Sequence, residues 1–135
     1  MVINNKHTIK CDLCHGEFNL SRDNLSEVQV TLNKEGFTPH DVNLTVLNCP
    51  ICGKNYIVIM DDAKTEALVT KLRSIAVKQA KLIRMGKPSA VLEQKYRDAQ
   101  WKLNFYRHKL AEKYIGSTYQ LEGVIEQLDY RYQAR

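Results

Sequence analysis

The sequence predicts an α+β protein: a small β-rich module over residues 1–61, then an antiparallel helical hairpin and a third, C-terminal helix over residues 62–135. Three observations support this prediction. Strand-length apolar runs and all four cysteines lie in the first part, heptad-spaced apolar residues fill the second, and the charge changes sign between them. With 135 residues, 44% hydrophobic and 26% charged, the composition is that of a globular chain.

Four short strands are expected in the first module. Segments 28–32 and 42–46 alternate apolar and polar residues, which is the period of a half-buried strand. Segment 56–60 is a continuous apolar run, and segment 8–10 leads into the first cysteine. A β-rich module of about sixty residues buries little apolar surface, so it usually needs disulfides or a metal for stability.

The cysteines form two Cys-x-x-Cys pairs, Cys11 with Cys14 and Cys49 with Cys52, and Gly53 follows the second pair. A tight turn between two cysteines directs both thiolates inward, and the glycine relieves a backbone position where φ becomes positive. Two such turns together make the tetrahedral four-sulfur site that zinc prefers, which predicts one structural Zn²⁺ per chain. The 34 residues between the pairs exceed the usual 15–20 and indicate an inserted pair of strands.

Other uses of the cysteines remain open. Disulfides would suit a secreted chain, but residues 1–10 contain no apolar signal core. A thioredoxin-type redox pair needs a βαβ context, and iron in the same site would give a rubredoxin-like electron carrier. His15 could replace one ligand, although four thiolates complete the shell. His7, His40 and His108 have no nucleophile or carboxylate at motif spacing and are expected to be structural or exposed.

Residues 7–60 resemble the zinc-ribbon family, because a strand leads into Cys-x-x-Cys and a second strand leads into Cys-Pro-x-Cys-Gly-x-x-Tyr. The resemblance implies a pair of rubredoxin-like knuckles, with the four cysteines as the metal ligands. It implies no particular activity, since zinc ribbons serve in many unrelated assemblies.

Two long helices are expected over residues 62–85 and 89–115. Asp62 and Ser89 are suitable N-cap residues, and Gly86 is a suitable C-cap. Apolar residues recur at spacings of three and four, and opposed positions in the two helices have index sums of 174 or 175, as an antiparallel hairpin requires. The expected seam consists of Leu68, Leu72, Ile75, Gln79 and Leu82 opposite Leu92, Tyr96, Ala99, Leu103, Tyr106 and Leu110.

A row of lysines is expected along one edge of this hairpin, because they occupy the same heptad position beside the seam. Residues 63–113 carry 13 basic and 4 acidic side chains, a net charge of +9, whereas residues 1–62 carry −3. Like charges placed in this way oppose folding slightly, so the row suggests an anionic partner. A solvated edge is the alternative. The predicted partner-binding residues are Lys64, Lys71, Lys78, Lys95, Lys102 and Lys109.

The third helix is expected over residues 117–133, since Ser117-Thr118-Tyr119-Gln120 resembles a capping box. It should cover the apolar stripe that Val69, Ala76 and Ile83 form on the first helix. Trp101 and Phe105 lie one turn apart on the second helix and are expected in the core.

No catalytic constellation or phosphate-binding glycine loop is present, which predicts a non-enzymatic protein. No apolar run reaches membrane-spanning length, which predicts an intracellular, cytoplasmic chain. The organisation is similar to small phage-encoded proteins that block host machinery, most specifically zinc-containing anti-CRISPR proteins directed against Cas9. That resemblance implies a regulator that docks on an acidic protein or nucleoprotein in the host cytoplasm and obstructs DNA loading. Direct binding of DNA or RNA by the basic hairpin is the alternative.

Overall fold

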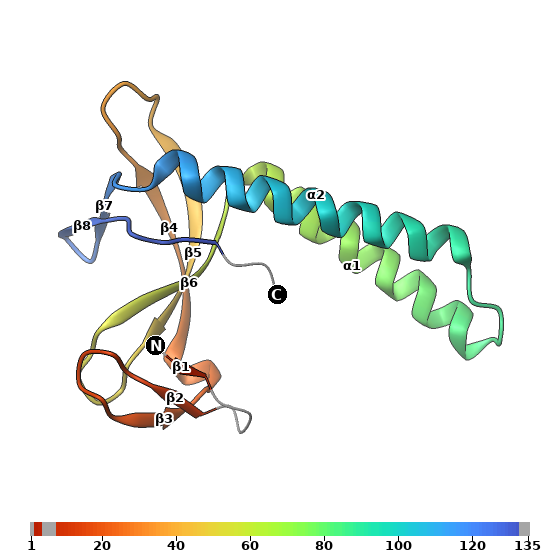
Figure 1. The fold of residues 1–135 in the computed structure, drawn as a ribbon, viewed down its shortest axis with the longest axis horizontal. Coiled ribbons are helices and arrows are strands. Elements are labelled where there is room, and N and C mark those ends of the chain that lie inside the picture. The colour runs from red at the N-terminus through yellow and green to blue at the C-terminus, as the bar shows by residue number, and fades with distance from the viewer. Residues whose placement is uncertain (1, 4–7, 133–135) are drawn as a thin grey trace.

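A computed structural model describes residues 2–3 and 8–132 and confirms the α+β class (Figure 1). Its N-terminal sheet is antiparallel, in the order β1-β2-β3, and the short helix η1 follows it. These elements are β1 (Val2–Ile3), β2 (Thr8–Lys10), β3 (Glu17–Asn19) and η1 (Arg22–Asn24).

The second sheet contains the three other strands that the sequence predicts, as β4 (Leu25–Leu32), β5 (His40–Asn48) and β6 (Asn55–Asp61). The order is β4-β5-β6 and both pairs are antiparallel. The alternation directs Val30 and Leu32 of β4, and Val42 and Leu44 of β5, into the core, where each is at most 6% exposed. The strand pair β4–β5 accounts for most of the predicted insertion between the cysteine pairs.

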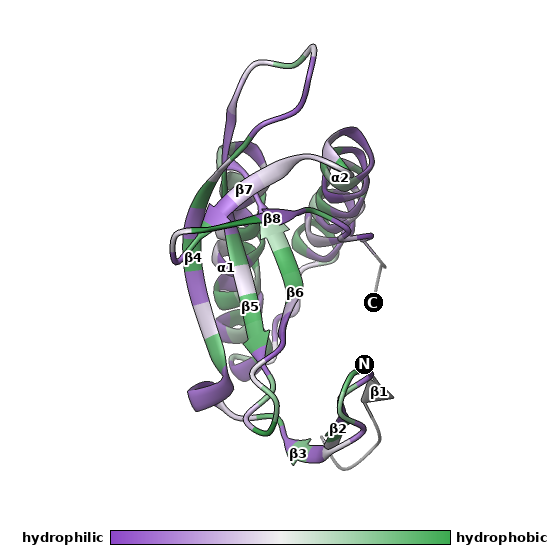
Figure 2. Ribbon diagram, turned by 90° about the vertical axis from the view of Figure 1, so that its left-hand side faces the viewer, coloured by the Kyte–Doolittle hydropathy of each residue, from purple (hydrophilic) through white to green (hydrophobic). Residues whose placement is uncertain are grey.

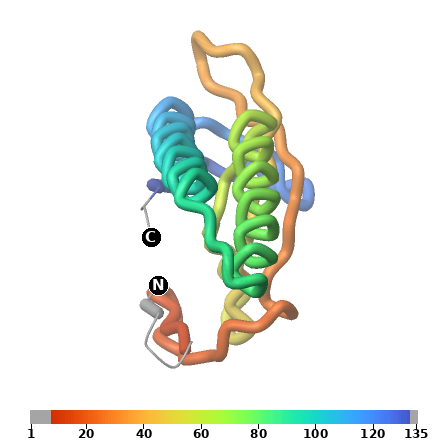
Figure 3. Tube along the Cα trace, turned by 90° about the vertical axis from the view of Figure 1, so that its right-hand side faces the viewer, coloured from red at the N-terminus to blue at the C-terminus, as the bar shows by residue number. Residues whose placement is uncertain are grey.

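The two predicted helices are α1 (Ala63–Arg84) and α2 (Ala90–Tyr114). Asp62 caps α1 by accepting from the Thr65 amide, and Ser89 caps α2 by accepting from the Leu92 amide. The helices are antiparallel and lie side by side, and most of their length extends away from the sheets (Figures 1 and 3). At 1.5 Å per residue they are about 33 and 38 Å long. We call residues 63–114 the helical arm.

The seam of the arm agrees with the heptad pattern. Ile75 of α1 and Ala99, Leu103 and Leu110 of α2 are at most 7% exposed. The remaining seam residues are half-buried, except Tyr96, which is 36% exposed. Neither helix has an apolar stretch of the length and hydropathy needed to cross a membrane.

The predicted third helix over residues 117–133 is wrong. The chain there forms a β-hairpin of β7 (Thr118–Leu121) and β8 (Val124–Gln127). The two residues between the strands, Glu122 and Gly123, have φ values of 52° and 79°, as a type I′ hairpin turn requires. Thr118 also exchanges two 2.8 Å backbone hydrogen bonds with Asn33 at the end of β4, which the helical alternative would forfeit.

As a consequence, the tail covers the sheets rather than the arm. The stripe expected to be covered is open: Val69 is half-buried, Ala76 is exposed, and Ile83 is 57% exposed. The expectation that Trp101 and Phe105 belong to the core is also wrong, since they are 66% and 42% exposed.

The main hydrophobic core joins both sides of the predicted boundary at residues 61 and 62. It packs the inner face of the second sheet against the end of α2 and the tail, and hydrophobic residues concentrate on strands β5 and β6 (Figure 2). Its buried members are Val30, Leu32, Val42, Leu44, Val46, Met60, Leu110, Ala111, Tyr114, Tyr119 and Leu128.

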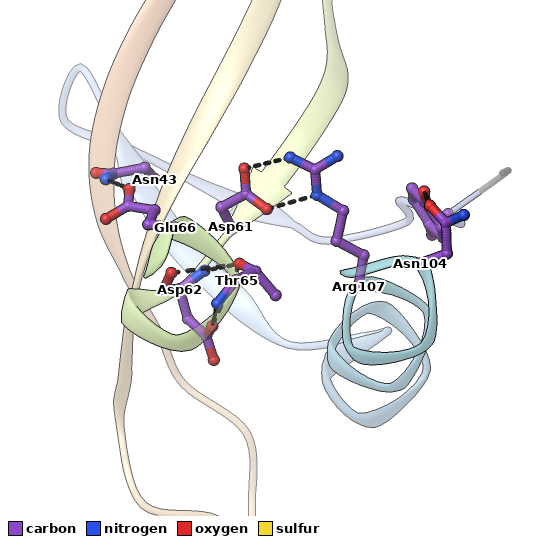
Figure 4. Close-up of polar contacts among 8 residues, drawn as sticks. Asn43, Asp61, Asp62, Thr65, Glu66, Asn104 and Arg107 are labelled. Atoms are coloured by element: carbon purple, nitrogen blue, oxygen red, sulfur yellow. Dashed lines mark hydrogen bonds and ion pairs between the residues drawn. The ribbon is translucent and has the colours of Figure 1, made fainter. Parts of the chain in front are cut away.

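Polar contacts anchor the base of the arm to the end of β6 (Figure 4). Arg107 of α2 donates two hydrogen bonds to the Asp61 carboxylate, of 2.7 and 2.8 Å. The Tyr132 hydroxyl donates to Asn104 at 2.5 Å, and Asn43 of β5 donates to Glu66 of α1. These contacts fix the base of the arm to the sheet and to the tail.

Candidate functional site

Each Cys-x-x-Cys pair forms the turn of a β-hairpin, one between β2 and β3 and the other between β5 and β6. In the first turn, the Cys11 amide donates to the Gly16 carbonyl at 3.0 Å, and the His15 amide donates to the Cys11 carbonyl at 2.9 Å. In the second turn, the Cys49 amide donates to the Lys54 carbonyl at 2.9 Å, and the Gly53 amide donates to the Cys49 carbonyl at 2.8 Å. The two knuckles thus share one backbone design.

The residue in the left-handed backbone position, the fourth after the first cysteine of each pair, is not the same in the two knuckles. Gly53 has a φ of 81°, and His15 in the equivalent position has a φ of 60°. A left-handed backbone costs a residue with a Cβ about 1–2 kcal/mol, so the first knuckle carries a strain that the second avoids. His15 is exposed and is not a member of the four-cysteine cluster.

The four sulfur atoms meet as the spacing predicts. The Sγ atoms of Cys11 and Cys52 are 3.7 Å apart, those of Cys14 and Cys49 are also 3.7 Å apart, and all four lie within 4.8 Å of one another. A tetrahedron with Zn–S distances of about 2.3 Å has S···S edges of about 3.8 Å. The cluster therefore fits a single tetrahedral zinc and is consistent with a zinc-ribbon segment.

Neighbouring polar groups favour thiolates in the cluster. The Tyr56 hydroxyl accepts a 3.1 Å hydrogen bond from the Asp12 amide and lies 3.1 Å from Cys11 Sγ. The Cys14 amide and then the Tyr56 hydroxyl lower the pKa of Cys11 to about 5. Burial and the hydrogen bond with Cys11 raise the pKa of Tyr56 to about 12, so the hydroxyl stays protonated and can donate a hydrogen bond to a Cys11 thiolate. Such outer contacts orient metal ligands.

The Cys14 thiol shows why a cation is needed. The Gly16 amide donates to Cys14 Sγ at 3.4 Å and lowers the Cys14 pKa, but burial and the three adjacent sulfurs raise it to about 11. Four neighbouring thiols cannot all ionise beside one another without a compensating charge. A bound Zn²⁺ supplies that charge.

The cysteines belong to a second, small hydrophobic core at this end of the molecule. Cys11 and Cys49 are fully buried, whereas Cys52 is exposed at the surface. Around them pack the buried residues Ile9, Phe18 and Leu47. These few side chains bury little surface between the two knuckles, so a metal held by the four sulfurs would be a main link between the two sheets.

The other histidines are distant from this cluster. His40 lies 3.0 Å from the Asp62 carboxylate and stacks on Tyr114 with ring centroids 5.1 Å apart, and His108 lies 3.0 Å from Glu112. His7 is outside the described residues. Within the described part of the chain, His40 and His108 therefore have structural contacts, as the sequence predicts.

The six predicted lysines are all exposed on the helical arm, three on each helix. Within the described residues, none of them forms an ion pair with a carboxylate. The four acidic residues of the arm have other partners: Glu66 binds Asn43, Glu93 binds Arg97, Asp98 binds Gln94 and Glu112 binds His108. The lysine charges are therefore not neutralised by the arm itself.

Two of these lysines contact aromatic rings. Lys64 Nζ of α1 lies 3.6 Å from the ring centroid of Tyr106 on α2, and Lys109 Nζ lies 5.6 Å from that of Phe105. The first contact crosses the seam and places Lys64 beside α2, as the predicted edge requires. Sequence reasoning missed the exposure of Phe105 and Trp101. Polar residues one turn away on the same side of the helix, Arg97 and Asp98 before Trp101 and His108 and Lys109 after Phe105, could have signalled it.

The fold and the site together define an α+β protein with a basic helical arm and a four-cysteine cluster that is consistent with a zinc-ribbon metal site. Comparisons with models of known families, with curated proteins and with solved structures gave no match.

Proposed function

We propose that this chain is a non-enzymatic zinc-binding protein that docks on a nucleic-acid-handling machine, and that the helical arm contacts the nucleic acid. The observation that carries the proposal is the uncompensated charge of the arm. Six exposed lysines lie on two packed helices, and every arm carboxylate is engaged with another group. Phosphates are the partner that such an arrangement of cations suits best.

The metal has a structural role in this proposal. Four thiolates fill the coordination shell of a tetrahedral zinc and leave no position for water or substrate. The centre lies in the β-rich end of the molecule, whereas most of the arm extends away from the sheets (Figure 1). Zinc therefore stabilises the body from which the arm projects.

The proposal is tested by reversing charges on the arm. Lys71, Lys78, Lys95 and Lys102 changed together to Glu should abolish retention on DNA while preserving the circular dichroism spectrum. For the unchanged protein, log affinity for a duplex should fall linearly with log salt at about −0.9 per phosphate contacted, which gives a slope of about −4 to −5 if most of the edge engages.

A matched control uses the same helix. Lys71→Glu with Lys78→Glu and Arg73→Glu with Arg84→Glu change the net charge equally, but the two arginines lie on the side of α1 away from the seam. Only the lysine pair should weaken binding strongly. Equal losses from both pairs would show that net charge matters and the lysine edge does not.

A second candidate is docking on an acidic protein surface. It is favoured by exposed apolar side chains on the arm: Val77 is 69% exposed, Val91 66%, and Ile83 and Met85 57% each. In this case isolated DNA and RNA should bind weakly, and the lysine substitutions should slow association with the acidic partner.

The most specific form of the proposal is an inhibitor of a Cas9-type nuclease, which the resemblance to zinc-containing phage proteins supports. The net charge of +9 on residues 63–113 makes mimicry of DNA by acidic side chains an unsuitable mechanism. The arm would instead occupy guide or target phosphates, or an acidic protein surface, and obstruct DNA loading. Loading of target DNA onto the guide-bound nuclease should fall as this protein is added, and undiminished loading at saturation would exclude it.

A further inference from the structure

A pair of stacked aromatic rings is exposed on the outer surface of α2. Trp101 is 66% exposed and Phe105 is 42% exposed. Their ring centroids are 5.5 Å apart and the ring planes differ by 13°. Tryptophan and phenylalanine side chains usually bury large apolar areas in folded proteins. Two such rings that contact each other and remain exposed to solvent are therefore a distinct surface feature.

This pair continues directly into the lysine edge. Phe105 makes an edge-to-face contact with Tyr106 at 5.4 Å, and Lys64 Nζ lies over the Tyr106 ring. Lys109 Nζ lies 5.6 Å from the centroid of Phe105. Lys102 is three residues from Phe105 and therefore lies on the same side of the helix. Aromatic rings and lysines that form no ion pair with a described carboxylate thus adjoin one another on the arm.

We propose that this surface binds single-stranded nucleic acid, with a base stacked on the Trp101–Phe105 pair and the adjoining phosphates on Lys102, Lys109 and Lys64. The inference rests on the proposed function and names the form of nucleic acid that the arm prefers. A duplex hides its base faces within its own stack, whereas a single strand offers them to an aromatic side chain. Phosphate contacts alone would not distinguish the two forms.

The charges around the pair support this occupant over an apolar protein segment. Lysines flank the rings on the side of the seam, and the nearest acidic residue on the same face, Asp98, is engaged by Gln94 at 2.9 Å. An apolar partner would have to desolvate these ammonium groups without compensation, whereas a nucleotide brings a phosphate for them.

The test uses the fluorescence of Trp101, which is the one tryptophan of the chain. A twelve-residue oligothymidylate should quench this fluorescence in a saturable way, because a stacked base contacts the indole directly. A twelve-base-pair duplex of mixed sequence should bind with little quenching. Equal affinity for both, without a change in fluorescence, would overturn the inference.

Variants separate the claim that the arm binds nucleic acid from the claim that a base stacks on the aromatic pair. Affinities are measured from the fluorescence anisotropy of a labelled oligonucleotide. Trp101→Ala and Phe105→Ala should each lower the ratio of single-strand to duplex affinity by about 5- to 150-fold, the effect of losing one stacked base. Trp101→Phe should retain more single-strand affinity than Trp101→Ala. Ile125→Ala is a matched control, because Ile125 is 70% exposed on β8, distant from the arm in sequence.

The possible results are distinguishable. If the lysine reversals weaken binding but the aromatic substitutions leave the ratio unchanged, the proposed function stands and the stacking inference fails. If neither the oligothymidylate nor the duplex binds, both fail. Because both aromatic side chains are largely exposed, their substitution should leave the circular dichroism spectrum unchanged, which the same samples verify.

Discussion

The ion pair between Arg107 and Asp61 should be a principal anchor of the helical arm. The guanidinium donates from Nε to Oδ1 at 2.7 Å and from Nη2 to Oδ2 at 2.8 Å. The two side chains are only 17% and 14% exposed. Arg107→Met removes the charge while retaining much of the stem, and Asp61→Asn removes the opposite charge with little change of shape. Either change leaves the other partner poorly compensated.

The burial of the pair determines the expected loss of stability. Exposed ion pairs contribute about 0–1 kcal/mol, and removing one partner of a fully buried pair costs about 3–5 kcal/mol. The exposures of Arg107 and Asp61 lie between these limits, and their contact is bidentate. Each single substitution should therefore lower the free energy of unfolding by about 2–3 kcal/mol. For a chain of this size, that loss lowers Tm by roughly 6–12 °C.

A double-mutant cycle measures this interaction. Urea unfolding of the zinc-loaded protein, both single variants and the double variant should give a coupling energy of about 1.5–2.5 kcal/mol. The double variant contains no uncompensated charge at this position, so the losses of stability measured for the two single variants should not add. A coupling energy below about 0.5 kcal/mol would refute the reasoning and show that the pair behaves as an exposed one.

Three further predictions concern the body. His15→Gly should raise the free energy of unfolding by about 0.5–1 kcal/mol in urea titrations because it relieves the positive φ, and Gly53→Ala should lower it; a destabilising His15→Gly would contradict the argument. Burial raises the pKa of Asp62, but the Thr65 amide and His40 outweigh it, so its pKa lies below the ordinary value. The stabilisation by the Asp62 carboxylate should therefore be present above about pH 4 and disappear as the pH falls below that value, and Asp62→Asn should lack this dependence in acid titrations of Tm. Cys49→Ser should abolish metal binding and unfold the knuckles while circular dichroism retains much of the helical signal, because the arm packs on the other core; complete loss of helix would contradict this.

Local patterns in the sequence predict the parts of this fold that local chemistry determines. The period-2 alternation locates β4 and β5, and the Asp62 and Ser89 caps locate the starts of both helices. The cysteine spacing brings four sulfurs together, because a knuckle is a local turn and each pair needs only its own hairpin. The lysines are exposed on the arm, since heptad position determines which side of a helix they occupy.

The tail was mispredicted because two local signals compete there. Ser117 has the spacing of a capping box, but its side chain is buried and makes no hydrogen bond to a described residue. The signal that decides the structure is the Glu122-Gly123 turn together with pairing to Asn33, a residue 85 positions before Thr118. A pattern within residues 117–133 alone cannot predict pairing with a strand that lies so far away in the sequence.

The exposure of Trp101 and Phe105 was missed for a different reason. Their spacing of one helical turn places them on one side of α2 but does not determine whether that side is covered. The role of Tyr56 beside Cys11 was also not deduced, although the residue belongs to the zinc-ribbon pattern. Its hydroxyl reaches the sulfur only because β6 returns beside the first knuckle.

The four-thiolate centre is tested most directly by metal analysis of the chain as isolated from its native host. The geometry predicts one zinc per chain, released when the four thiols are blocked, with an apparent binding free energy of about 10–16 kcal/mol, as for other structural zinc sites. Substitution of Cys49 by Ser should remove the metal. The absence of stoichiometric metal, or redox-active iron in its place, would contradict a structural zinc centre.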